Sequence, residues 1–162
     1  LSQVEQSEYM KHPVYGYSAV KTENWISSTG KSIILFHHER IDGSGYPLKA
    51  KEIPYEAAIV GVCDAFDEMI CGIGCKRIKV YEAIEYMKIY KGSRFPKEIV
   101  DALLQFTAVY PAGSTVLLTN GQTGKVVRQN NDFSDRPVIE LKNHDIIDLV
   151  KINNVFIEKV LE

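Results

Sequence analysis

The order of apolar and polar positions predicts a helical first part of the chain. Between residues 54 and 70, apolar side chains recur at spacings of three and four, which is typical of an amphipathic helix. The predicted inward stripe of this helix consists of Ile59, Val60, Cys63, Phe66 and Ile70. Asp64 lies beside that stripe, one turn beyond Val60. A carboxylate is therefore expected near the edge of the helical core.

Proline and glycine positions delimit further helices. We expect a short helix over 4–11, and a second one that starts near Pro13, because a proline after His12 disfavours the helical region there. A helix over 81–90 has Ile84 and Met87 inward. Another is predicted over 96–110, with an apolar set of Ile99, Val100, Leu103, Leu104 and Phe106. The segment 31–36 ends in four apolar residues without alternation, so periodicity alone permits a buried strand or a helix.

The pattern changes after residue 110. The sequence 115–128 predicts a β-hairpin, because Asn120-Gly121 suits a tight turn with positive φ between two apolar stretches. Two more strands are predicted over 136–141 and 148–152. We therefore expect a mainly α chain: a helical domain over residues 1–110 and a small antiparallel β appendage over 111–162.

Composition excludes some classes of partner and compartment. A formal net charge of −2 gives no overall attraction to DNA. No apolar run approaches the ~20 residues of a membrane-spanning helix, and residues 1–6 resemble no signal peptide. Cys63, Cys71 and Cys75 are an odd number without disulfide spacing, which indicates reduced thiols and a cytoplasmic protein. We predict that they are buried small residues; the alternative is that Cys71 and Cys75 form half of a metal site.

Metal-ligand residue types gather in the helical part. They are His12, His37, His38, Asp64 and Asp67. Nitrogen and carboxylate donors without a nearby thiolate favour iron, manganese or zinc. The alternative interpretations are that His12 is a surface residue and that His37 and His38 place positive charge at a helix end. Adjacent helical residues point ~100° apart, so both imidazoles can serve one centre only if metals lie between their directions.

Residues 37–47, His-His-Glu-Arg-Ile-Asp-Gly-Ser-Gly-Tyr-Pro, resemble the signature of the HD-GYP family. The family pattern is His-His-Glu-x-x-Asp-Gly-x-Gly-Tyr-Pro, and every defined position is met. The resemblance implies the C-terminal part of an HD-type helical bundle, with 31–36 as helix. It also implies hydrolysis of cyclic di-GMP to linear pGpG or GMP in bacterial signalling, with two or three divalent metal ions. Similar β appendages follow the helices of many HD-GYP proteins.

The same resemblance implies a set of metal ligands. His12-Pro13-Val14-Tyr15-Gly16 is similar to the family's His-Pro-x-x-Gly segment, and Asp64-Ala65-Phe66-Asp67 is similar to its Asp-x-x-Asp segment. His12, His37, His38 and Asp64 are the implied ligands. We assign Glu39 and Asp42 to the catalytic group as hydrogen-bond acceptors for the imidazoles. The alternative for both is a solvated helix end.

The loop that ends the signature is expected to act at the rim of the site. Gly43 and Gly45 permit tight backbone geometry, and Tyr46-Pro47 stiffens the exit. The resemblance favours a role for these four residues in shaping the pocket or contacting a signalling protein. The alternative is a purely structural turn.

The chain departs from the family pattern in two places. The family's His-Asp dyad and following Gly-Lys normally precede the His-Pro segment, and here that part is absent; His144-Asp145 comes too late to replace it. We therefore expect a fragment of a longer protein, inactive or poorly active alone; the alternative is a natural remnant. The family's Arg-Pro-Tyr element is also missing after Asp67, although Lys76 and Arg77 fall near its basic residues. These two residues are assigned to substrate binding; the alternative is a solvated charge run.

Three functions follow as hypotheses. The first is a cyclic di-GMP phosphodiesterase, as a monomer or a homodimer. The second is a degenerate module that binds nucleotide or a partner protein without catalysis. The third is a related hydrolase that acts on a linear dinucleotide or another phosphate ester.

Overall fold

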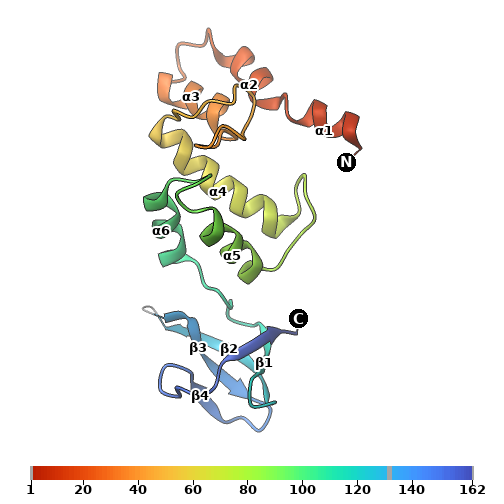
Figure 1. The fold of residues 1–162 in the computed structure, drawn as a ribbon, viewed down its shortest axis with the longest axis vertical. Coiled ribbons are helices and arrows are strands. Elements are labelled where there is room, and N and C mark those ends of the chain that lie inside the picture. Colours follow the sequence, from red (N-terminus) through yellow and green to blue (C-terminus); the bar gives the residue numbers. More distant parts are fainter. Residues whose placement is uncertain (1, 131–132, 162) are drawn as a thin grey trace. The chain divides into compact units, whose positions relative to one another are not determined.

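A computed structural model describes residues 2–130 and 133–161 of the chain. The chain forms two compact units, and the boundary between them along the sequence falls between Leu103 and Leu104. The helices are α1 (Gln3–Tyr9), α2 (His12–Val20), α3 (Ser28–Phe36), α4 (Tyr55–Cys71), α5 (Val80–Tyr90) and α6 (Lys97–Phe106). The helices precede all of the strands, which confirms the predicted mainly α fold with a β appendage (Figure 1).

Local sequence explains where several helices begin and end. Ser2 and Glu5 form a capping box at the start of α1, and the Ser27 hydroxyl accepts a hydrogen bond from the Gly30 amide at the start of α3. Gly72, with a φ of 78°, ends α4 in the left-handed conformation. Residues 31–36 lie within α3, which confirms the helix that the family resemblance implied for this segment.

Helix α4 lies between α3 and α5 in the first unit (Figure 1), and it buries small side chains. Its buried residues are Ala57, Ala58, Gly61, Val62, Ala65 and Phe66. The predicted stripe is therefore wrong for Ile59 and Val60, which are 39% and 38% exposed, and for the exposed Cys63. Small residues face inward because α3 approaches closely: a Cβ at Gly61 would collide with the carbonyl oxygen of His37.

The three cysteines are free and exposed, so the prediction that they are buried is wrong. Cys63 lies on the outer face of α4, opposite the small residues that contact α3. Cys71 ends α4 and Cys75 lies in the loop that follows, where solvent reaches both.

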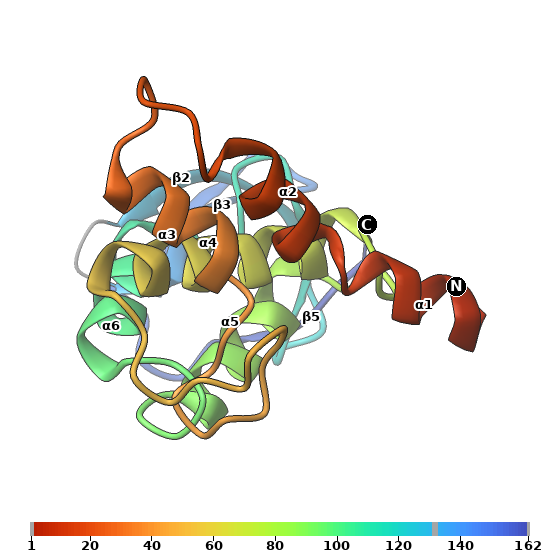
Figure 2. The same cartoon turned by 90° about the horizontal axis from the view of Figure 1, so that it is seen from above.

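Helix α5 and the larger part of α6, up to Leu103, complete the first unit. Ile84 and Met87 are fully buried, as predicted, and Ile99 and Val100 are buried on α6. Phe106 is 88% exposed, which contradicts its predicted place in the core; it is the last residue of α6, beyond the packed face. Helix α1 buries no residue, and it projects away from the other helices of the unit (Figure 2).

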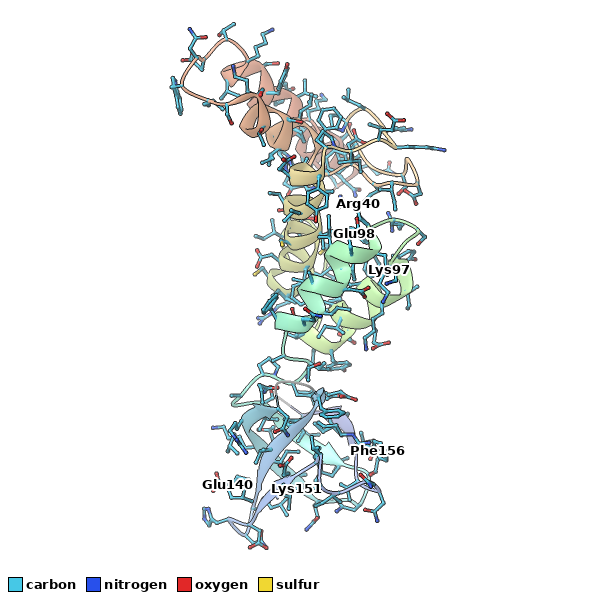
Figure 3. The ribbon with its side chains drawn as sticks, turned by 90° about the vertical axis from the view of Figure 1, so that its left-hand side faces the viewer. Arg40, Lys97, Glu98, Glu140, Lys151 and Phe156 are labelled. Carbon is cyan, nitrogen blue, oxygen red and sulfur yellow. The ribbon has the colours of Figure 1, made fainter. Side chains whose placement is uncertain are left out.

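The second unit is a five-stranded antiparallel sheet with the order β4-β3-β2-β1-β5. The strands are β1 (Thr115–Leu118), β2 (Thr123–Asn130), β3 (Phe133–Leu141), β4 (Ile146–Asp148) and β5 (Ile157–Val160). One face buries a core of Val116, Leu118, Val126, Ile139, Leu141, Leu149 and Val155. Residues such as Glu140 and Lys151 project from its surface (Figure 3).

The hairpin over 115–128 is confirmed, with Gly121 at a φ of 81° in its turn. The strand predicted over 148–152 is wrong: β4 ends at Asp148, and the chain turns there so that Leu149 enters the core. The last strand, β5, was not predicted. It pairs with β1 through Val116 and Val160 and covers an edge that the hairpin alone leaves open.

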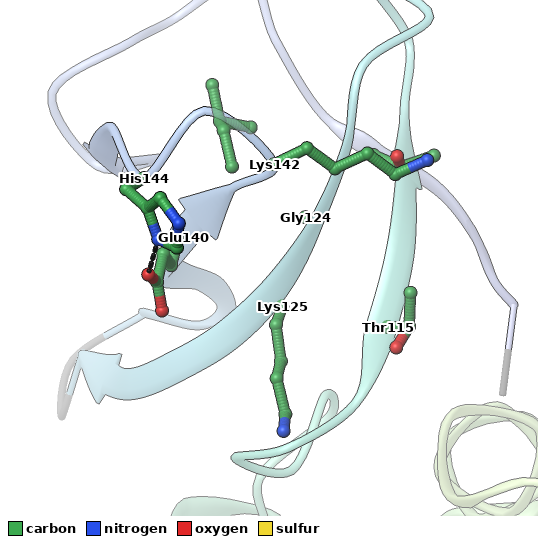
Figure 4. Close-up of a pocket in the computed structure, with 8 residues that line it drawn as sticks. Thr115, Gly124, Lys125, Glu140, Lys142 and His144 are labelled. Carbon is green, nitrogen blue, oxygen red and sulfur yellow. Dashed lines mark hydrogen bonds and ion pairs between the residues drawn. The ribbon is translucent and has the colours of Figure 1, made fainter.

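A shallow pocket lies on the second unit, over β1, β2 and the end of β3 (Figure 4). Its lining includes Thr115, Lys125 and Lys142, and the His144 imidazole is paired with the Glu140 carboxylate at 2.9 Å. This histidine of the His144-Asp145 pair is thus engaged within the sheet unit. Among the residues that the structure describes, no helix is both long and apolar enough to cross a bilayer.

Candidate metal centre

Three imidazoles converge from two helices of the first unit. His12 is the first residue of α2, and His37 and His38 follow the last turn of α3. The Nε2 atom of His12 lies 3.2 Å from that of His37 and 3.1 Å from that of His38. The ligand atoms of all three residues lie within 4.8 Å of one another. The structure therefore brings together the three histidines that the sequence resemblance singled out.

Backbone carbonyls orient two of these rings. His12 Nδ1 lies 2.8 Å from the carbonyl oxygen of Tyr9, and His37 Nδ1 lies 3.0 Å from that of Ile34. A carbonyl can only accept, so each Nδ1 carries the hydrogen and each Nε2 presents its lone pair. Nitrogen lone pairs that face one another are stabilised by a shared cation, and this orientation by a second partner is typical of metal-binding histidines.

Two carboxylates of α4 extend the cluster. Asp64 Oδ2 lies 3.5 Å from His38 Nδ1, and within the described part of the chain it is a buried oxygen without a hydrogen-bond partner. Glu68 lies one turn further on, and ligand atoms of His38, Asp64 and Glu68 also fall within 4.8 Å of one another. A buried carboxylate oxygen that lacks a donor is an energetic cost that a bound cation would remove.

Burial shifts the pKa values of His38 and Glu68. His38 is 3% exposed, and its pKa is lowered to about 3 by burial, with smaller contributions from the neighbouring charges of His37, His12 and Arg40. The pKa of Glu68 is raised by burial, although a hydrogen bond from the Tyr9 hydroxyl acts in the opposite direction. His38 is therefore neutral near pH 7, which is the state that binds metals.

Two glycines let the backbone place the histidines. Gly61 allows the carbonyl oxygen of His37 to approach α4, and a Cβ at Gly45 would lie 2.5 Å from the carbonyl oxygen of His38. The Tyr46 ring stacks on the His38 ring, with centroids 4.5 Å apart and an interplanar angle of 21°. Tyr46 therefore contacts the cluster directly, and the peptide between it and Pro47 is cis.

Glu39 does not accept hydrogen bonds from the imidazoles, contrary to the sequence prediction. Its buried carboxylate instead accepts from the backbone amides of Leu48, at 2.6 Å, and Ala50, at 2.9 Å. Backbone carbonyls perform the function that we assigned to it. Glu39 thus fastens the loop that follows the signature.

Asp42 also points away from the imidazoles. Its carboxylate accepts from the Ser44 amide at 2.8 Å and lies 3.8 Å from Arg94 Nε. The Ser44 hydrogen bond is the main reason that the pKa of Asp42 lies below its ordinary value. Gly43 adopts a φ of 79° in the same turn. Asp42 therefore shapes the loop and joins it to the segment between α5 and α6.

Lys76 and Arg77 lie on the exposed loop after α4. The Arg77 Nε donates to the carbonyl oxygen of Ile70 at 3.0 Å, so this side chain folds back on the helix end. The loop lies against Tyr9, whose hydroxyl donates to the Glu68 carboxylate: a Cβ at Gly74 would be 3.8 Å from that hydroxyl oxygen. Asp67 is exposed and lies 3.4 Å from the Cys71 thiol, apart from this cluster.

Sequence reasoning missed Glu68. It is four residues after Asp64, a spacing that places both side chains on one face of a helix, so this signal was available. The Asp-x-x-Asp pattern drew attention to Asp67, which is three residues after Asp64 and turns outward.

A family model described as an HD domain matches residues 1–99, which is more than half of the chain. The chain belongs to the HD domain family. It is related to the HD-GYP cyclic di-GMP phosphodiesterases, as the signature indicated. The match covers the helices that hold the imidazoles and carboxylates.

Relatives of this HD domain carry names from cyclic di-GMP signalling. A cyclic di-GMP phosphodiesterase response regulator, RpfG, from Xanthomonas campestris is 38% identical over 109 residues, which are 65% of this chain and 29% of that protein. A cyclic di-GMP phosphodiesterase from Thermotoga maritima is 40% identical over 106 residues, 62% of this chain and 29% of that protein. The chain thus spans less than a third of these relatives.

A solved structure shares the fold of the HD domain. Bd1817, described as an HDG"Y"P protein from Bdellovibrio bacteriovorus, matches with a TM-score of 0.53 and 24% identity, over 64% of this chain and 35% of that one. At this identity the likeness concerns the fold alone.

The residues present fit a divalent metal ion. The family is metal-dependent, and the donor set here offers three converging imidazoles together with a buried carboxylate oxygen that lacks a donor. Nitrogen and oxygen donors of this kind suit zinc, iron or manganese.

Proposed function

We propose that this chain forms part of a metal-dependent phosphodiesterase that hydrolyses cyclic di-GMP to linear pGpG or GMP. The observation that carries the proposal is the convergence of His12, His37, His38 and Asp64 in the helical unit. The relatives named above supply the substrate class.

Within this chain, one set of residues would hold the cation and another would fix the adjoining loop. His12, His37, His38 and Asp64 would hold the cation, and Glu39 and Asp42 would keep the adjoining loop in place. A bound cation supplies Lewis acidity to a phosphodiester and lowers the pKa of water at the site.

Two other parts of the surface would meet the substrate and partners. Lys76 and Arg77 lie on the loop that packs against Tyr9, the partner of the Glu68 carboxylate, and their charges suit the two phosphates of a cyclic dinucleotide. We place contact with a signalling protein at the 43–47 loop, where Ser44 is exposed, Gly43, Tyr46 and Pro47 are half-buried, and Gly45 is buried.

Metal content tests the proposal. Replacing His37 and His38 together by alanine in the full-length protein should abolish bound metal, measured by inductively coupled plasma mass spectrometry, and hydrolysis of cyclic di-GMP. Helicity measured by circular dichroism should be nearly unchanged, because alanine is a strong helix former. A folded double variant that retains its metal would refute the ligand assignment.

A second candidate is a module that binds the nucleotide without hydrolysing it. The observation that favours it is the loop after α4, where the Arg-Pro-Tyr element is missing. Product analysis of the full-length protein with Mn²⁺ or Fe²⁺ separates the two functions: pGpG or GMP supports the enzyme, and saturable binding without product supports the module. A panel that includes linear pGpG also tests the third hypothesis, a related phosphate-ester hydrolase.

A further inference from the structure

We infer that Glu68 is a cation ligand, acting with Asp64 beside the three imidazoles, and that Tyr9 is the positioning residue that holds its carboxylate there. Glu68 belongs to neither the signature nor the implied ligand set, so this adds a ligand to the centre. The inference rests on the proposed metal-dependent function.

Glu68 and Asp64 form a paired-carboxylate position. They lie four residues apart on α4 and therefore on one face. Ligand atoms of both carboxylates and of His38 lie within 4.8 Å of one another, and Oδ2 of Asp64 is buried without a hydrogen-bond donor in the described structure. Two carboxylates this close repel each other when both are ionised. A divalent cation between them would relieve that repulsion and satisfy the buried oxygen.

The paired-carboxylate position and the imidazoles share His38. A neutral imidazole has a single lone pair, so His38 can ligate through one nitrogen only. Its Nε2 faces the other imidazoles, and its Nδ1 faces Asp64 Oδ2 at 3.5 Å. Nδ1 makes no hydrogen bond with Oδ2 at this distance, so the carboxylate oxygen stays available to a cation. A cation at the carboxylates then takes its protein ligands from Asp64 and Glu68.

Tyr9 connects both halves of the centre. Its hydroxyl donates to Glu68 Oε1 at 3.0 Å, and its carbonyl oxygen accepts from His12 Nδ1 at 2.8 Å. Helix α1 buries no residue, so core packing does not explain why this tyrosine turns inward. Its ring lies against the loop after α4, since a Cβ at Gly74 would be 3.5 Å from Tyr9 Cε1. One residue thus fixes ligands in both groups.

The two groups should differ in the ions they prefer. Three imidazoles suit Zn²⁺, whereas carboxylate oxygens suit Mn²⁺. Loss of Glu68 should therefore weaken Mn²⁺ binding and leave Zn²⁺ binding at the imidazoles nearly intact. If Tyr9 only tethered α1, loss of its hydroxyl would change neither Mn²⁺ binding nor Zn²⁺ binding.

The experiment titrates the 162-residue chain with two ions. Mn²⁺ binding is monitored through the electron paramagnetic resonance signal of the free ion, and Zn²⁺ binding is measured by calorimetry. Glu68→Gln should weaken Mn²⁺ binding at least about tenfold, and Tyr9→Phe should weaken it by about tenfold, the scale typical of an outer partner of a ligand. Controls are Glu56→Gln, on the exposed first turn of α4, and Tyr15→Phe, whose hydroxyl donates to the exposed Glu8. Both should bind Mn²⁺ like the unchanged chain. Circular dichroism verifies folding.

The outcomes separate this inference from the proposed function. If Glu68→Gln binds Mn²⁺ like the unchanged chain while His12→Asn loses Zn²⁺, Glu68 is no ligand and the imidazole centre stands. If Glu68→Gln loses Mn²⁺ but Tyr9→Phe does not, the positioning role of Tyr9 is refuted. If the folded, unchanged chain binds neither ion, both the inference and the proposed metal dependence of this unit fail.

Discussion

Glu39 is a buried carboxylate whose hydrogen bonds go to backbone amides. Both of its oxygens are engaged, by the amides of Leu48 and Ala50. Hydrogen bonds to a charged group contribute about 1.5–3 kcal/mol each. The residue therefore stabilises the loop after the histidines, and its loss would leave two amides without their partner.

Replacing Glu39 by alanine should lower the free energy of unfolding by about 3 kcal/mol, because two charge-assisted hydrogen bonds are lost. Urea denaturation measures the change, and faster limited proteolysis within residues 43–52 would locate it. Glu52→Ala is the matched control, since Glu52 is an exposed glutamate near the end of the same loop. Equal stability of the two variants would show that the hydrogen bonds from Glu39 to the Leu48 and Ala50 amides do not stabilise the loop.

The depressed pKa of His38 predicts acid sensitivity in the metal-free protein. The pKa is about 3 in the folded chain and about 6.5 when unfolded, so the unfolded chain binds the extra proton first. The stability contributed by the buried neutral ring is fully present above pH 6.5 and is lost as the pH falls toward 3. Between pH 7 and pH 4 the loss should be about 3 kcal/mol.

Urea midpoints measured in chelator across this range test the effect. His38→Gln should flatten the profile, because glutamine does not titrate. His144→Gln should not, because His144 is an exposed residue of the other unit. A profile unaffected by His38→Gln would show that other groups cause the acid sensitivity.

At the scale of elements, the contact between α3 and α4 sets the site. The closest approach occurs at Gly61, where the carbonyl oxygen of His37 occupies the space that a Cβ would need. The helix that carries Asp64 and Glu68 is thereby held against the end of the helix that presents the imidazoles.

Gly61→Ala should push α3 away from α4. We expect a loss of about 2 kcal/mol in the free energy of unfolding, the usual scale of overpacking, together with weaker Zn²⁺ binding. Cys63→Ala, on the exposed face of the same helix, should change neither quantity. Thermal denaturation with and without Zn²⁺ measures both effects, and unaltered Zn²⁺ affinity in Gly61→Ala would separate the helix contact from the site.

The same contact explains what the sequence could and could not predict. Caps, prolines and spacing located the helices, the hairpin and the histidine pair, because these signals are local. The predicted inward face of α4 is wrong, because the prediction places the largest apolar side chains in the core, whereas the structure buries small residues such as Ala57 and Gly61. A rule based on side-chain size misses a face built for close backbone approach.

The site shows the same division. His12, His37, His38 and Asp64 could be named from motifs, whereas the contact between Tyr9 and Glu68 joins two segments that are distant in sequence. Strand β5 was missed for the same reason: its pairing with β1 joins residues about forty positions apart, as in Val116 with Val160. No local pattern encodes such partners.

At the scale of the whole molecule, the two units have separate cores. The sheet unit buries its own apolar cluster, which includes Leu118, Ile139 and Leu149. The imidazoles and carboxylates all belong to the first unit. A ligand stabilises only the part of a protein that binds it in the folded state.

Calorimetry of the chain should therefore resolve a transition that responds to metal and one that does not. Zn²⁺ at 100 times its dissociation constant stabilises its unit by about 2.7 kcal/mol, which should raise the midpoint of that unit by about 10 °C. The midpoint of the sheet unit should stay fixed, and the helical circular dichroism signal, which comes mainly from the first unit, identifies the transition of that unit. Equal shifts of both transitions would show that the units unfold together.

Glu39 accepts hydrogen bonds from the main-chain amides of Leu48 and Ala50 and makes none with their side chains. Leu48 is 56% exposed although its amide is held at 2.6 Å. The two hydrogen bonds themselves therefore exclude only proline at positions 48 and 50, because proline lacks the required N–H. Homologous proteins can vary the displayed surface at these positions, and so change what they recognise, while the imidazoles a few residues away keep their geometry.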